Sequence, residues 1–116
     1  MTIQEAAQRS GLSAHTLRYY ERIGLIHSVG RSGNGHRDYA EGDLVWLEFL
    51  TKLRTTGMPI ADMCRYVELR RMGAHTADER REMLELHRER VRSRIAELTQ
   101  DLKVLDYKID HYRGQA

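Results

Sequence analysis

Residues 13–22 read Ser-Ala-His-Thr-Leu-Arg-Tyr-Tyr-Glu-Arg, and they are the most informative segment of this chain. A helix is predicted from Ser13 to about Ile23, because a serine hydroxyl can accept a hydrogen bond from an N–H of the first turn. On this helix Leu17 and Tyr20 point to one side. Most of the remaining surface is polar and belongs to His15, Arg18, Tyr19 and Arg22. Such a helix fits the major groove of DNA, where its N-terminal residues can reach base edges.

The polar residues of this segment have a chemistry that suits nucleic acid. Arg18 can donate two hydrogen bonds side by side to a guanine or to a phosphate. Tyr19 can donate its hydroxyl to a phosphate, and Thr16 suits a phosphate together with the N–H groups of the first turn. The alternative interpretation is that Arg18 and Arg22 form only a solvated helix face, since helix-turn-helix patterns occur by chance in many sequences.

The segment before Ser13 predicts a second, shorter helix. Thr2 and Glu5 fit a capping box, and Gly11 suits the left-handed turn that ends a helix. Two short helices joined by residues 10–12 form a helix-turn-helix. Basic charge is concentrated here, because residues 9–37 contain five arginines and one acidic residue. A surface that binds phosphates requires such a concentration.

Residues 25–39 predict a β-hairpin, the wing of a winged helix-turn-helix. Apolar residues open this segment, glycines form its tip, and a short strand returns to Tyr39. Arg31 and Arg37 flank the tip, so we expect them to contact backbone phosphates beside the groove. Tyr39 either packs beneath the wing or bonds a phosphate, and packing is the favoured alternative.

Two longer helices are expected next, so that residues 1–72 form the DNA-binding domain. The first runs from about Glu41 to Thr56 and carries an apolar stripe at helical spacing. The stripe consists of Leu44, Leu47, Leu50 and Leu53, widened by Val45, Trp46 and Phe49. The second begins near Pro59, whose missing N–H costs nothing in a first turn, and extends to about Met72. Its predicted buried face consists of Ile60, Met63, Cys64 and Val67.

Residues 76–113 are predicted to form one long helix for dimerisation. Thr76 and Glu79 fit a capping box at its start, and neither Gly nor Pro follows before Gly114. Apolar residues then recur at alternating spacings of four and three, which defines a heptad seam. The seam consists of Val91, Ile95, Leu98, Leu102, Leu105, Ile109 and Tyr112, extended at its start by Leu84. A helix with one narrow apolar stripe needs a partner helix, most simply that of a second copy.

The charges beside the seam favour an antiparallel coiled coil. In a parallel pair Asp101 would approach the partner's Asp106. Antiparallel registers instead bring Arg94 near Asp101, or Arg92 near Asp106. Because each exposed ion pair contributes only about 0.2–1 kcal/mol, the preference is small.

Composition and motifs exclude several classes of protein. The N-terminus has no signal-peptide pattern, no apolar run is long enough to span a membrane, and a single cysteine can form no intrachain disulfide. We therefore expect a cytoplasmic protein without a membrane partner. The six histidines lack ligand-like spacing, and the chain has no catalytic constellation. No metal, no cofactor and no enzymatic activity are expected, and the net charge of +2 is uninformative about nucleic acid.

Cys64 has two open interpretations. Its spacing to Ile60 and Val67 favours core packing, where a thiol acts as a small apolar group. Arg65 is adjacent and residues 70–71 are nearby arginines, and cationic neighbours can lower a thiol pKa, which favours a redox or electrophile sensor. Core packing is the favoured interpretation.

These motifs together resemble the MerR family of regulators, over essentially the whole chain. The most specific match is the segment from Thr16 to Glu21 followed by Gly24-Leu25. Further matches are Ala6-Ala7, Gly11-Leu12-Ser13, Ile26, Arg37, Tyr39, Asp43-Leu44, Leu53-Arg54 and Gly57-Met58-Pro59-Ile60. Residues 77–109 resemble the short members of the family that respond to aldehyde and nitrosative stress.

The resemblance implies a mechanism. Family members are homodimers joined by an antiparallel coiled coil of the last helix. They bind a near-palindromic promoter site and bend and untwist the DNA, so that RNA polymerase, an indirect partner, can engage promoter elements set unusually far apart. By match to the family motifs, the DNA-binding positions are His15, Thr16, Arg18, Tyr19 and Arg37, with Tyr39 beside the last.

The chain departs from the family pattern in three ways. Residues 27–31 lack the proline that many members have before the arginine, and the paired cysteines of metal-sensing members are missing. The cysteine that stress-responsive members would carry near Leu53 is also absent. Two alternatives stay open: a DNA architectural protein with broad sequence tolerance, and a coiled-coil module that contacts only protein.

Overall fold

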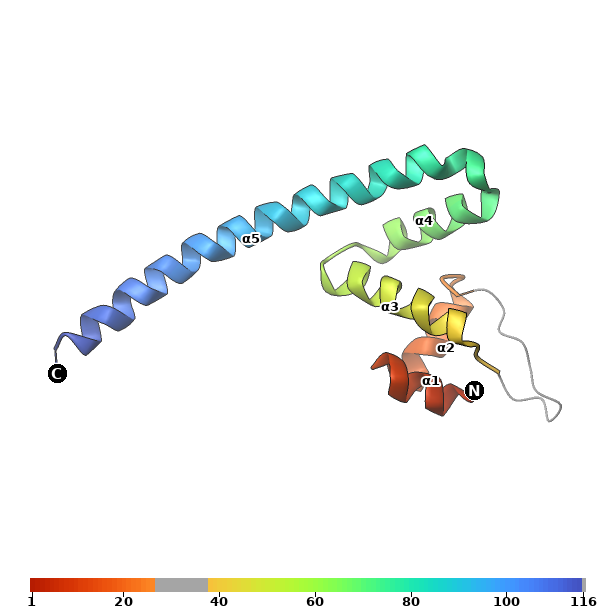
Figure 1. The fold of residues 1–116 in the computed structure, drawn as a ribbon, viewed down its shortest axis with the longest axis horizontal. Helices are drawn as coiled ribbons and strands as arrows, with labels where there is room; N and C mark the ends of the chain where they lie inside the picture. The colour runs from red at the N-terminus through yellow and green to blue at the C-terminus, as the bar shows by residue number, and fades with distance from the viewer. Residues whose placement is uncertain (27–37, 116) are drawn as a thin grey trace. The chain divides into compact units, whose positions relative to one another are not determined.

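The computed structural model describes residues 1–26 and 38–115, and its regular structure in these ranges is helical. In chain order the elements are α1 (Ile3–Ser10), α2 (Ala14–Arg22), α3 (Glu41–Thr55), α4 (Ile60–Met72), the 3₁₀ helix η1 (Ala74–Thr76) and α5 (Ala77–Arg113) (Figure 1). Two compact units make up the chain, Met1–Arg80 and Arg81–Ala116. The predicted wing, with Arg31 and Arg37, lies outside the described residues.

Both short helices begin where the sequence predicts. Thr2 Oγ1 accepts a hydrogen bond from the N–H of Glu5 at 3.1 Å, and Ser13 Oγ accepts one from the N–H of Thr16 at 3.0 Å. Between them Gly11 has a φ of 77°. Because glycine alone adopts this left-handed conformation without strain, Gly11 ends α1 and turns the chain into α2. The predicted helix-turn-helix is therefore present.

The core of the first unit forms where α3 packs against α1 and α4 and where α1 packs against α2. Its buried apolar side chains are Ala6, Leu17, Tyr20, Leu25, Ile26, Tyr39, Leu47, Leu50, Leu53, Met58, Met63, Tyr66, Val67 and Leu69. The leucines of α3 confirm most of the predicted stripe. Val45 does not belong to it, because its side chain is 71% exposed. Val45 precedes Leu47 by two residues, which places it about 200° away around the helix.

The buried face of α4 is only partly the predicted one. Met63 and Val67 are buried, whereas Ile60 and Cys64 are half-buried. Tyr66 and Leu69, which the prediction omitted, are buried in their place. The ring of Tyr66 lies against Phe49 of α3, with 5.7 Å between the ring centroids. This aromatic contact between the two helices explains why the buried face of α4 includes Tyr66.

Thr76 and Glu79 do not form the predicted capping box. Thr76 lies in η1, which the sequence did not predict, and is buried. Its Oγ1 donates to the carbonyl of Leu69 at 2.6 Å and accepts a hydrogen bond from Nε of Arg80 at 3.0 Å. Glu79 pairs instead with Arg65 of α4, at 3.2 Å. Because the Arg65–Glu79 pair is exposed and contributes little, the buried hydroxyl of Thr76 is the main link between the start of α5 and α4.

α5 is a single continuous helix of 37 residues, as the sequence predicts. Ion pairs along its surface join side chains one turn apart, such as Arg92 to Glu89 at 2.8 Å and Arg94 to Glu97 at 3.2 Å. Such pairs support an exposed helix. No helix in the described ranges combines the length and the apolar character that crossing a membrane requires.

Candidate nucleic-acid interface

α2 has an apolar face in the core and a polar face on the surface. Leu17 and Tyr20 are buried, whereas Thr16 and Tyr19 are half-buried. Residues three or four apart lie on the same side of a helix. The polar face therefore consists of His15, Arg18, Tyr19 and Arg22. Three of these side chains are exposed: His15, Arg18 and Arg22. The structure places these sequence-predicted residues together on the surface of one helix.

The N-terminus of α2 has hydrogen-bond donors of the kind that bind anions. The hydroxyl of Ser13 accepts the N–H of Thr16 and donates to Thr16 Oγ1 at 2.9 Å. The proton of the Thr16 hydroxyl is therefore available for another acceptor. No acidic residue lies in the first turn of α2. The partial positive charge of the helix terminus is thus not offset there, which suits a phosphate.

The arginines of α2 differ in how they are held. Within the described part of the chain, Arg18 makes no hydrogen bond or ion pair, so its guanidinium is available for a base edge or a phosphate. The guanidinium of Arg22 lies over the ring of Tyr19, 5.5 Å from the centroid. The rings of Tyr19 and Tyr20 are 6.2 Å apart. These contacts link the polar face of α2 to the buried Tyr20.

The turn that follows α2 is held by side chains of α3 and α4 that no sequence pattern indicates. Nε1 of Trp46 in α3 donates to the carbonyl of Leu25 at 2.9 Å. Nη2 of Arg71 in α4 donates to the carbonyl of Gly24 at 2.5 Å. The guanidinium of Arg70 lies 4.2 Å from the centroid of the Trp46 ring. No local sequence pattern could have paired these residues, because they are far apart along the chain.

Tyr39 is a core residue with 1% of its surface exposed, which agrees with packing, the alternative that the sequence favours over a phosphate contact. Its backbone pairs with Met1, since the N–H of Tyr39 donates to the carbonyl of Met1 and the Met1 amine donates to the carbonyl of Tyr39, both at 2.7 Å. The same amine lies 2.8 Å from Oδ1 of Asp38. That hydrogen bond raises the pKa of the amine above its ordinary value of 8.0. These contacts hold Tyr39 beside the N-terminal residue.

Arg9, one of the arginines counted in the basic region, is engaged within the protein. It donates to both carboxylate oxygens of Glu41 in α3, at 2.7 and 3.0 Å. This hydrogen bonding holds the pKa of Glu41 below its ordinary value of 4.5 and raises that of Arg9. A bidentate pair of this kind joins α1 to α3 and leaves Arg9 less suited to phosphate binding.

Cys64 is half-buried, and the arginines that favoured a sensor role are directed elsewhere. Arg65 pairs with Glu79, Arg70 covers the Trp46 ring and Arg71 binds the carbonyl of Gly24. These contacts weaken the argument for a thiol activated by cations. In the ranges that the structure describes, no three His, Cys, Asp or Glu side chains are grouped to hold a metal ion.

α5 carries a second candidate surface, within the second unit. Most of the seam residues are exposed: Ile95, Leu98, Leu102, Leu105, Ile109 and Tyr112. Leu84 and Val91, nearer the start of the helix, are half-buried. Apolar side chains exposed in a row at heptad spacing are typical of a helix that pairs with another helix.

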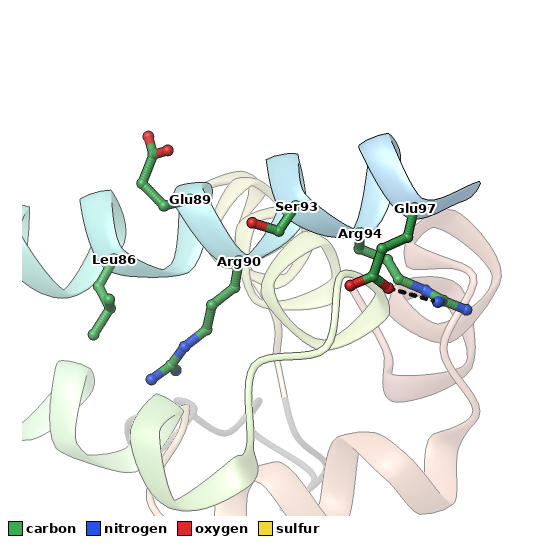
Figure 2. Close-up of a pocket in the computed structure, with 6 residues that line it drawn as sticks. All are labelled: Leu86, Glu89, Arg90, Ser93, Arg94 and Glu97. Carbon is green, nitrogen blue, oxygen red and sulfur yellow. Dashed lines mark hydrogen bonds and ion pairs between the residues drawn. The ribbon is translucent and has the colours of Figure 1, made fainter. Parts of the chain in front are cut away.

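A shallow groove of about 370 Å³ also runs along α5 (Figure 2). It is lined by Leu86, Glu89, Arg90, Ser93, Arg94 and Glu97. Figure 2 shows Leu86 and Arg90 pointing to the same side, and Arg94 paired with Glu97. Because all six residues come from successive turns of one helix, the groove is a feature of the helix surface rather than an enclosed binding site.

Family models match both parts of the chain. The model of the MerR family regulatory protein matches residues 2–39, and the model described as MerR, DNA binding matches residues 44–107. An HTH-type transcriptional regulator of Haemophilus influenzae is 39% identical over 97% of this chain and 83% of its own length. The HTH-type transcriptional regulator AdhR of Bacillus subtilis is 42% identical over 78% of this chain and 65% of its own length.

Solved structures agree with these matches. A MerR family transcriptional regulator from Listeria monocytogenes has a TM-score of 0.90 at 41% identity, covering 97% of this chain and 85% of its own. HiNmlR, a MerR family regulator lacking the sensor domain, was solved bound to promoter DNA. It has a TM-score of 0.89 at 39% identity, covering 97% of this chain and 89% of its own. The chain therefore belongs to the MerR family, and it is a DNA-binding transcription regulator rather than an enzyme.

Proposed function

We propose that this regulator acts as a homodimer that binds a near-palindromic promoter site and distorts the DNA. The observation that carries the proposal is that one chain has an exposed polar face on α2 and an exposed apolar seam on α5. The polar face suits one half of a DNA site, and the seam suits a second copy. Two-fold symmetry of the protein then matches two-fold symmetry of the site.

In this proposal α2 enters the major groove. Arg18 reaches a guanine or a phosphate, because its guanidinium is exposed and is not paired within the described residues. Thr16 and the N-terminal N–H groups of α2 bind a phosphate, and His15, Tyr19 and Arg22 extend the contact surface. Arg31 and Arg37 are assigned to phosphates beside the groove, on the resemblance of their segment to a wing. Tyr39 is left out, since it is buried.

The dimer forms through α5, as an antiparallel coiled coil. The exposed apolar residues from Ile95 to Tyr112 would be covered by the same helix of the second copy. In this arrangement residues 1–72 form the DNA-binding domain and residues 76–113 the dimerisation helix. The dimer presents two α2 helices to one site, which doubles the contacts to DNA.

Distortion of the DNA is the proposed means of regulation. HiNmlR, similar over 97% of this chain, was solved on promoter DNA, which supports a promoter as the target. Bending DNA costs on the order of 1–10 kcal/mol, and phosphate contacts from both copies would offset it. RNA polymerase would then engage promoter elements that it cannot reach together on straight DNA. A role in stress response rests on the resemblance of residues 77–109 alone.

A band-shift titration tests the DNA-binding part of the proposal. The full chain is titrated against its own upstream DNA and against random duplex, at two salt concentrations. We expect tighter binding to the upstream DNA, weakened by salt. Equal affinity for both duplexes would favour an architectural protein instead, and absence of binding at low salt would contradict any role on DNA.

Arg18→Ala is the informative variant, and Arg65→Ala in α4 is its matched control. Both remove one exposed arginine, but Arg65 lies on another helix and pairs with Glu79. We expect Arg18→Ala to weaken specific binding by about 1–3 kcal/mol and the control to bind like the wild type. Retained specific binding in Arg18→Ala would mean that α2 is not the recognition helix.

A further inference from the structure

The turn from Ile23 to Ile26 joins α2 to the segment that follows it. Successive backbone N–H groups of this turn make hydrogen bonds to carbonyls of α2. The N–H groups of Leu25 and Ile26 donate to the carbonyl of Tyr20, at 2.9 and 3.3 Å. The N–H of Gly24 donates to the carbonyl of Glu21 at 3.3 Å. These bonds fold the turn back onto the last turn of α2.

Two side chains from other helices bind the carbonyls of the same turn. Arg71 of α4 binds that of Gly24, and Trp46 of α3 binds that of Leu25. Gly24 has a φ of 86°, and a Cβ added there would lie 3.5 Å from Nη1 of Arg71. The guanidinium of Arg71 therefore lies directly against the turn. It also lies 3.8 Å from the carboxylate of Glu68.

The Trp46 side chain is itself held in place. The Arg70 guanidinium covers its ring, and the ring of Phe49 is stacked on it at 5.6 Å. Phe49 in turn contacts Tyr66 of α4. The ring stack thus joins α3 to α4 around the indole. A donor whose rotamer is fixed by packing holds its acceptor with less loss of entropy than a mobile one.

We propose that Trp46 and Arg71 are positioning residues for DNA recognition. They act through the carbonyls of Leu25 and Gly24, which follow the polar face of α2 by two or three residues. By fixing this turn they set the direction of the C-terminal half of α2, including Arg22, without contacting DNA. The inference rests on the proposed role of α2 in the major groove.

Three variants of the full chain test this role. Trp46→Phe keeps an aromatic ring in the stack but removes the N–H donor. Arg71→Met removes the guanidinium and keeps an apolar stem, and Arg71→Lys returns one donor. Arg65→Met is the matched control, because it removes an arginine of the same helix that pairs with Glu79 and not with the turn.

Affinity is measured on a duplex that the wild-type chain selects from a random-sequence pool, over a series of salt concentrations. We expect Trp46→Phe and Arg71→Met each to weaken binding by about 3- to 10-fold, because a turn that is held less firmly orients α2 less well. The slope of log affinity against log salt should stay unchanged, because no phosphate contact is lost. Arg71→Lys should recover part of the affinity, and Arg65→Met should bind like the wild type.

Each other outcome has a definite meaning. If the slope of log affinity against log salt falls by about one in Arg71→Met, the variant has lost one phosphate contact. Arg71 would then contact DNA directly, which would overturn the positioning role. Unchanged affinity in both variants, whether or not the melting temperature falls, would overturn it as well. If the wild-type chain selects no sequence from the pool, the proposed specific binding fails instead, before any variant is measured.

Discussion

Replacing Leu98 and Leu102 by lysine should separate the two copies of the proposed dimer. Complete burial of a leucine contributes about 1.5–3 kcal/mol. In the single chain Leu98 is 45% exposed and Leu102 57% exposed. Pairing can therefore bury about half of each side chain, a contribution of about 0.8–1.5 kcal/mol per leucine. A dimer contains two copies of each, so the double substitution removes about 3–6 kcal/mol of association free energy.

This loss corresponds to a large change in the dissociation constant. At about 1.4 kcal/mol per factor of ten, the dimer should weaken by about 100- to 10,000-fold. This fold-change in the dissociation constant is a lower limit, because each lysine also places a charge against the apolar face of the partner helix. Sedimentation equilibrium over a wide range of protein concentration measures the change, and circular dichroism checks that α5 stays helical.

The same helix offers a matched control. Val104 and Tyr107 are 70% and 76% exposed but lie off the seam. Each is two residues beyond a seam leucine, about 200° around the helix. Replacing both by lysine should leave the dimer intact. An unchanged dissociation constant in the Leu98/Leu102 variant, or an equal loss in the control, would refute the assignment of the seam.

Three further predictions concern the first unit. Arg18→Ala should weaken specific DNA binding by about 1–3 kcal/mol while sedimentation still reports a dimer; a band shift like that of the wild type would contradict the assignment. Ser13→Ala should lower the free energy of unfolding by about 1 kcal/mol in urea titrations, since the N–H of Thr16 loses its acceptor; an unchanged midpoint would argue against the cap. The Glu41 carboxyl should titrate below its ordinary pKa of 4.5 in NMR spectra and return toward it in Arg9→Met. Since folding lowers the pKa of Glu41, the pair with Arg9 stabilises the folded protein above pH 4.5, and this stabilisation is lost as the pH falls through the lowered pKa. The same Glu41 pKa in the wild type and in Arg9→Met would contradict the pairing.

Much of the fold could be predicted from local patterns. Thr2 and Ser13 cap helices because their acceptors lie three residues from the N–H groups they bind, within reach of any chain that begins a helix there. The continuity of α5 follows from the absence of helix-breaking residues. The polar face of α2 was predictable for the same reason, because helical periodicity places its residues on one side.

Other features depend on which helix packs against which. Tyr66 is buried because Phe49 of α3 lies beside it, and Val45 is exposed although it continues an apolar run. Thr76, a good cap by sequence, is used instead to bind the carbonyl of Leu69 in the preceding helix. In each case the sequence pattern was compatible with two environments, and packing selected one.

The sequence by itself determined the starts of α1 and α2, the apolar stripe on α5 and the polar surface of α2, because each depends on residues a few positions apart. The tertiary structure alone decided that Arg9 binds Glu41, and that Trp46 and Arg71 bind the turn after α2. These partners are separated by 32, 21 and 47 residues. A contact between residues so far apart in the chain forms only when the helices pack together. No local sequence period or motif can therefore predict it.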